Sequence, residues 1–185
     1  DRSVSRGLGD VYKRQELAMS LHNELESGRQ VGYLTLGDSM TYSTYGYLIT
    51  ALREIYPQLQ HRTYAGITSF AAIAAHFDWP LGEGKERVLL LPCPEEMPDL
   101  RADILTHDLV VLMKIGRRLP QVLVLLEELG ITENCVFAQR LGFSEERTSR
   151  GLADLPRDAE AGYLSTMLIR REAHQPRHQM PTRPL

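Results

Sequence analysis

Two short segments with the pattern of strands, each followed by a glycine corner and a helical pattern, dominate the first half of the chain. Residues 31–36 are mostly apolar and typical of a buried strand, and residues 61–64, HRTY, are expected to form a second strand. The corners that follow them are Gly37-Asp38 and Ala65-Gly66. Helices are expected after the corners, at residues 43–55 and 70–77. Strand, helix, strand, helix at this spacing predicts parallel β-α-β pairing.

The remaining sequence continues the same alternation and predicts a mixed α/β fold. Further strands are expected at residues 87–91, 109–113, 135–139, 148–150 and 163–169. Further helices are expected at residues 17–28, 100–105 and 120–129, the first ending at Gly28 and the last at Gly130.

Composition excludes several classes of function. The net charge is −3 and no stretch is strongly basic, so nucleic acid is not an expected partner. Cys93 and Cys135 have no close-spaced partner, which argues against a zinc knuckle or a disulfide framework. His174 and His178 are four residues apart, but the Pro- and His-rich tail around them is expected to be disordered, and no metal site is predicted. No apolar run approaches membrane-spanning length and no signal peptide is evident, so a cytoplasmic protein without a membrane partner is expected.

Residues 1–15, DRSVSRGLGDVYKRQ, show neither helical nor strand periodicity. They resemble translated sequencing-adapter text, so we expect a non-native leader, with native sequence from Glu16 and its upstream part missing. A disordered native N-terminus is the alternative.

The two corners are candidate ligand-binding elements. Ligands of open α/β sheets bind beyond the carboxyl ends of strands, glycine permits close approach, and helix starts offer free N–H groups. Asp38 could accept a hydrogen bond from a ribose hydroxyl or meet an ammonium group. By spacing alone, an ordinary turn followed by helix caps explains the same residues.

Residues 34–45, LTLGDSMTYSTY, resemble the GDPMTYSTY segment of the tetrapyrrole methylases, in particular the precorrin-2 C20-methyltransferases. Residues 65–70, AGITSF, are similar to that family's PGITSF segment. Residues 110–114, VVLMK, and 163–169, YLSTMLI, resemble its VLMK and YFSTILI strands. The four matches are collinear over residues 16–172. Ser39 and Ala65 replace two family prolines, and the N-terminal strand with its GxGPGDP loop is absent.

The resemblance implies two α/β domains with S-adenosylmethionine (SAM) folded in a cleft between them. Residues 16–66 would be an incomplete N-terminal domain, residues 67–172 the C-terminal domain and residues 173–185 a disordered tail. The implied SAM contacts are Leu36, Gly37, Asp38 and Thr41 from the first corner, Thr68 and Ser69 from the second, Met113 beside the adenine, the pair Gly151 and Leu152, and Thr166 on the last strand.

The implied reaction is methyl transfer from SAM to carbon 20 of precorrin-2 or cobalt-factor II in cobalamin biosynthesis, by a homodimer. The sulfonium is already activated, so the protein mainly positions the reactants. No catalytic base is identified; Tyr42, Tyr45 and His76 are interpreted as structural. Arg117-Arg118 could meet substrate carboxylates or simply be solvated. The alternatives are another tetrapyrrole methylase, a diphthine synthase-like enzyme, or an inactive SAM-binding or dimerising fragment.

Overall fold

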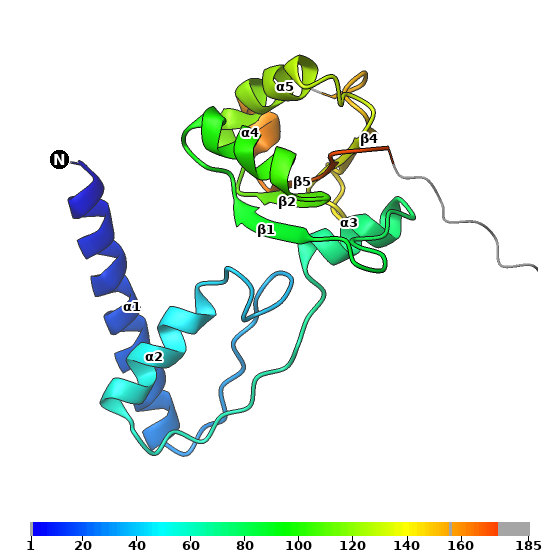
Figure 1. Cartoon of the computed structure of the whole chain (residues 1–185). Helices are drawn as coiled ribbons and strands as arrows, with labels where there is room; N and C mark the ends of the chain where they lie inside the picture. Colours follow the sequence, from blue (N-terminus) through cyan, green and yellow to red (C-terminus); the bar gives the residue numbers. More distant parts are fainter. Residues whose placement is uncertain (1, 156, 174–185) are drawn as a thin grey trace, which may run out of the picture. The chain divides into compact units, whose positions relative to one another are not determined.

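The computed structural model describes residues 2–155 and 157–173. The chain divides into two compact units, Asp1–Thr68 and Ser69–Leu185, which Figure 1 colours from blue to cyan and from green to red. The tail expected to be disordered, with His174 and His178, lies beyond the described residues.

The first unit contains two packed helices, α1 (Arg2–Glu26) and α2 (Tyr45–Ile55). Their contact buries Ala18 against Leu48 and Leu52. Helix α1 begins at Arg2, although residues 1–15 show no helical periodicity in the sequence. The ends of α1 and of α2 agree with the sequence expectation to within two residues.

The two segments expected to be strands in this unit, residues 31–36 and 61–64, are irregular, so the expected parallel pairing of these strands is also wrong. Leu34 is 93% exposed and Tyr64 is 70% exposed. A strand is stable only when its backbone pairs with neighbours and one face is covered, and two strands alone are marginal in water. Residues 2–68 contain no strand that could complete such a sheet.

The second unit is built on a five-stranded sheet with the order β1-β2-β5-β3-β4. The strands are β1 (Val88–Pro92), β2 (Leu109–Met113), β3 (Cys135–Gln139), β4 (Arg147–Arg150) and β5 (Ser165–Arg170). Strands β1 and β2 are parallel and are joined through helix α4 (Met97–Thr106). All other neighbouring strands are antiparallel. All five strands expected for this part of the chain are confirmed to within two residues.

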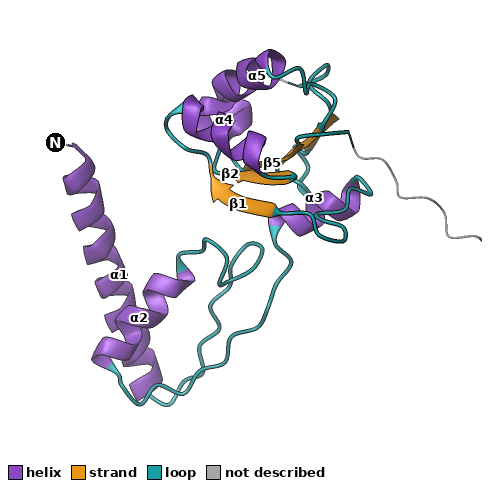
Figure 2. Ribbon diagram, in the orientation of Figure 1, coloured by secondary structure: helices purple, strands orange, loops and turns teal. Residues whose placement is uncertain are grey.

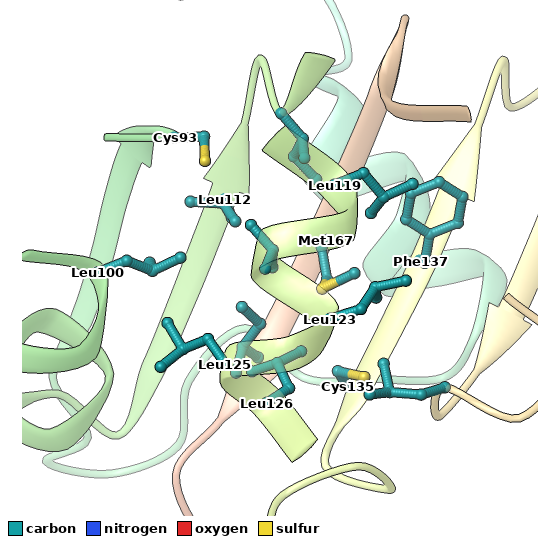
Figure 3. Close-up of a cluster of buried hydrophobic side chains, with 14 of the residues drawn as sticks. Cys93, Leu100, Leu112, Leu119, Leu123, Leu125, Leu126, Cys135, Phe137 and Met167 are labelled. Atoms are coloured by element: carbon teal, nitrogen blue, oxygen red, sulfur yellow. The ribbon is translucent and has the colours of Figure 1, made fainter. Parts of the chain in front are cut away.

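Helices cover both faces of this sheet, as Figure 2 shows for α4, α5 (Leu119–Glu128) and α3 (Ser69–His76). The core under α4 and α5 contains Leu112, Phe137 and Met167, drawn with α5 in Figure 3. The core under α3 contains the alternate residues of the same strands, such as Val111 and Leu168. Because successive side chains of a strand point to opposite faces, strands covered on both faces read as continuous apolar runs. The mixed α/β fold expected from the sequence is confirmed.

The strand register fixes which chain segments meet at one edge of the sheet. Met113 at the end of β2 pairs with Pro92 at the end of β1 and with Thr166 near the start of β5. Thr166 pairs in turn with Ala138 near the end of β3. The carboxyl ends of β1, β2 and β3 therefore lie together, and we call this the carboxyl edge.

Candidate functional site

The first corner is held together by the carboxylate of Asp38. Its Oδ1 accepts hydrogen bonds from the Met40 N–H (3.0 Å) and the Thr41 hydroxyl (2.9 Å). Its Oδ2 accepts from the N–H of Gly66, 28 residues later in the chain (2.9 Å). These donors, Gly66 first, hold the pKa of the Asp38 carboxyl below its usual range. Asp38 thus connects the two corners that the sequence had only placed in order.

The two corners approach each other at their glycines. A Cβ added to Gly66 would lie 2.9 Å from the carbonyl carbon of Gly37 and would overlap its oxygen. Gly37 itself has φ +73°, a left-handed backbone that glycine adopts without strain. The Tyr45 hydroxyl bonds the Thr63 hydroxyl (3.1 Å) nearby. Only glycine at residue 66 permits this contact.

This geometry revises the expected role of Asp38. A carboxylate has about four lone-pair positions, and three of them are used within the corner. The side chain of Thr41 is committed to the same network, whereas Leu36 is 74% exposed. Asp38 is therefore a structural clamp, and contact of Leu36, Gly37, Asp38 or Thr41 with SAM stays a prediction.

A second group of predicted residues meets at the carboxyl edge of the sheet. The hydroxyls of Ser69, the first residue of α3, and Thr166 are 3.0 Å apart although 97 residues separate them in the sequence. Met113 is the β2 residue opposite Thr166. Thr166 and Met113 are largely buried and Ser69 is exposed. The edge thus combines two hydroxyls, the N-terminus of a helix and an apolar side chain. Thr68, another residue expected to contact SAM, directly precedes Ser69 in the chain.

Two loops close tightly over this edge. A Cβ added to Gly162 would lie 2.7 Å from the carbonyl carbon of Gly116, so the short helices η1 (Gly116–Arg118) and η2 (Ala159–Gly162) touch through backbone. The buried Gln139 amide donates to the carbonyls of Glu160 (3.1 Å) and Tyr163 (3.0 Å). These contacts fix the chain segment that leads into β5 and Thr166.

Backbone strain also collects at the carboxyl edge. Lys114 follows β2, Arg140 follows β3 and Leu164 precedes β5, and each has φ +51°. Side chains rarely adopt this conformation, and such residues gather at functional sites. Arg140 and Leu164 could not be singled out from the sequence, because left-handed backbone at a residue other than glycine is imposed by the surrounding structure.

Gly151 and Leu152 do not join the Ser69, Met113 and Thr166 group. The Gly151 N–H donates to the carbonyl of Cys135 at the beginning of β3 (2.8 Å). Thr166 lies opposite Ala138, three residues or roughly 10 Å further along that strand. Leu152 is buried in the core under α4 and α5. The structure therefore gives this pair a packing role.

Neither cysteine of the chain is activated as a nucleophile. Burial raises the pKa of the Cys93 thiol, and the nearby guanidinium of Arg118 offsets part of this rise. Burial raises the pKa of the Cys135 thiol to about 12. His76 stands at the far end of α3 from Ser69, with its ring 4.8 Å from that of Phe77.

Among residues 2–155 and 157–173, no group of acidic, His and Cys side chains could hold a metal ion. In the same residues, no helix has the length and apolar character to cross a bilayer.

Sequence comparison finds relatives over most of the chain. Residues 2–156 match the family model of the Tetrapyrrole (Corrin/Porphyrin) Methylases. The chain is 32% identical over 162 residues to a cobalt-precorrin-2 C(20)-methyltransferase of Salmonella typhimurium, covering 85% of this chain and 65% of the relative. It is 27% identical over 169 residues to a precorrin-2 C(20)-methyltransferase of Sinorhizobium, covering 91% of this chain and 66% of the relative. The chain thus spans just under two thirds of these relatives.

Solved structures share the fold at lower identity. A cobalt precorrin-4 methyltransferase superposes with a TM-score of 0.65 at 19% identity, covering 83% of this chain and 69% of that one. A uroporphyrin-III C-methyl transferase from Thermus thermophilus complexed with S-adenyl homocysteine gives 0.56 at 18% identity, covering 83% and 71%. The match of the family model to residues 2–156, with this shared fold, places the chain in the tetrapyrrole (corrin/porphyrin) methylases.

Proposed function

We propose that this chain acts in SAM-dependent methylation of carbon 20 of precorrin-2 or cobalt-factor II, a step of cobalamin biosynthesis. The observation that carries the proposal is the 32% identity over 162 residues to a protein named for that reaction on the cobalt-containing substrate. The carboxyl edge supports it independently, because three residues expected to bind SAM from the resemblance meet there.

The chemistry of this edge fits SAM. Met113 supplies an apolar surface for an adenine ring, and Ser69 and Thr166 supply hydroxyls for the ribose or the amino-acid part. The first turn of α3 has N–H groups without helical partners, which suit a carboxylate. We therefore place Ser69, Met113 and Thr166 in direct contact with SAM, and Thr68 beside them. When bound, SAM supplies an electrophilic methyl group on a sulfonium.

The residues of the chain contribute positioning more than acid–base chemistry. The Ser69–Thr166 hydrogen bond ties the start of α3 to the central strand, and the η1–η2 contact holds the loops on either side. Reactants that the protein already holds in the correct orientation lose little further entropy when they reach the transition state. This smaller entropy loss accounts for much of the rate acceleration of such a transfer. Residues 16–66 and 67–172 are proposed as its two domains, in a cytoplasmic homodimer.

Two measurements test the proposal. Calorimetry of the chain with S-adenosylhomocysteine (SAH) is expected to give saturable binding, weakened in Ser69→Ala and unchanged in Ser27→Ala, a matched change at an exposed serine after α1. Incubation with SAM and precorrin-2 or cobalt-factor II is expected to give the C20-methylated product. SAH binding without transfer to either substrate supports instead a SAM-binding fragment, and absence of SAH binding refutes the cofactor assignment.

A further inference from the structure

Cations gather at the middle of the carboxyl edge. Lys114 directly follows β2, Arg118 ends η1 after the same strand, and Arg140 directly follows β3. Because β5 lies between β2 and β3, Lys114 and Arg140 are separated by two strand spacings, roughly 10 Å. Acidic residues also lie near these cations, since Glu145 is 3.8 Å from Arg140 and Glu160 lies in η2.

Two of these cations have donors that remain unused. The Nε atoms of Arg118 and Arg140 are buried and have no hydrogen-bond partner among the described residues. One terminal nitrogen of Arg118 donates to the carbonyl of Lys114 (3.3 Å). Arg140 forms an ion pair with the carboxylate of Glu145 at 3.8 Å, a distance too long for a hydrogen bond. Buried polar groups are nearly always paired, so one N–H of each guanidinium stands out because it has no partner among the described residues.

Between the cations lies an apolar surface. Tyr163 is 62% exposed and Leu164 is 52% exposed, and both directly precede β5, the strand between β2 and β3. Leu164 is held at φ +51°, and its carbonyl accepts from the N–H of Arg140 (3.0 Å). An exposed apolar patch with cations on both sides suits a flat apolar ring that carries carboxylates on its rim.

We infer that Lys114, Arg118 and Arg140 bind the carboxylate side chains of the tetrapyrrole, with its ring lying over Tyr163 and Leu164. The inference rests on the proposed function, which supplies a tetrapyrrole as the substrate. Guanidinium groups pair with carboxylates through two parallel hydrogen bonds, so the two arginines also fix the orientation of the ring.

The test uses porphyrins as probes, followed by absorbance and fluorescence titration of the full chain. Uroporphyrin carries an acetate and a propionate on every pyrrole ring, and coproporphyrin keeps only the propionates. The wild-type chain is expected to bind uroporphyrin more tightly than coproporphyrin. Arg118→Gln and Arg140→Gln are each expected to weaken uroporphyrin binding about tenfold, the loss of one charged hydrogen-bonded pair. Arg140→Lys, which keeps the charge, is expected to lose less.

Two controls separate this inference from the proposed function. Arg157→Gln removes an exposed arginine paired with Glu127 and is expected to leave porphyrin binding unchanged. The affinity for SAH is expected to stay within about twofold of the wild-type value in Arg118→Gln and Arg140→Gln, a smaller change than the loss of one hydrogen bond to SAH would cause. Absence of uroporphyrin binding, equal affinity in wild type and both arginine variants, or an equal loss in Arg157→Gln overturns the inference. Failure of the wild type to bind SAH, with arginine-dependent porphyrin binding intact, overturns only the methyltransferase proposal.

Discussion

The contact between Gly162 and Gly116 makes the carboxyl edge sensitive to a single methyl group. In Gly162→Ala, the new Cβ would start 2.7 Å from the carbonyl carbon of Gly116, whereas ordinary contact begins at 3.4 Å. The η1 and η2 backbones must therefore separate by at least 0.7 Å, and further to clear the carbonyl oxygen. Overpacking of this kind costs about 1–3 kcal/mol. The expected drop in Tm is about 2–4 °C for each kcal/mol.

The same displacement is expected to lower SAH affinity, because the loops that move flank Thr166. Differential scanning calorimetry and isothermal titration of the same preparations measure the two effects together. Gly46→Ala is the matched control, since a Cβ there meets nothing within 4 Å and alanine favours the helix. An unchanged Tm together with unchanged SAH affinity in Gly162→Ala would refute the close approach of η1 and η2 and its part in positioning the site.

Three further changes test other parts of the structure. Asp38→Asn is expected to loosen the corner, measured as weaker protection of the Gly66 amide against hydrogen exchange. Because the pKa of Asp38 is lowered in the fold, the stabilisation by its carboxylate is present at neutral pH and is lost as the pH falls through that lowered value. Protection of the Gly66 amide that changes neither with the substitution nor with the lower pH would contradict the clamp. Thr166→Val removes the hydrogen bond to Ser69 at nearly constant side-chain volume. It is expected to lower the free energy of unfolding in urea titration by about 0.5–1.5 kcal/mol and to weaken SAH binding. Wild-type stability together with wild-type SAH affinity would exclude this residue from the site. Cys135, with its pKa raised to about 12, is expected to resist iodoacetamide at pH values near 8 in the folded chain and to react once the chain is unfolded in urea, as mass spectrometry would detect; labelling of the folded chain would contradict its burial.

The sequence predicted best those elements whose own residues are fully buried. Strands β2 and β3 occur at the expected residues, since a run that is apolar on both faces has few alternatives to a covered strand. Residues 31–36 carry a similar signal without forming a strand, because strand formation also depends on pairing partners that no local pattern reveals. The antiparallel insertion of β5 between β2 and β3 is likewise a long-range property of the whole sheet.

The candidate site was predicted unevenly for the same reason. The family resemblance, not the spacing of residues, selected Ser69, Met113 and Thr166, and the sheet register brings them together. It also selected Gly151, which the structure places at the other end of β3. The clamp formed by Asp38 could not be predicted, because its third donor comes from the second corner.

The central position of β5 has a consequence for how the chain folds during synthesis. On a translating ribosome, the parallel pair β1–β2 and the hairpin β3–β4 emerge first, and neither can join the other until residues 165–170 leave the exit tunnel. Until then β2 and β3 each expose an edge of unpaired backbone N–H and C=O groups, which is open to pairing with other nascent chains. We therefore expect the sheet of this unit to close only when β5 becomes available, in one cooperative step that joins the two halves of the sheet.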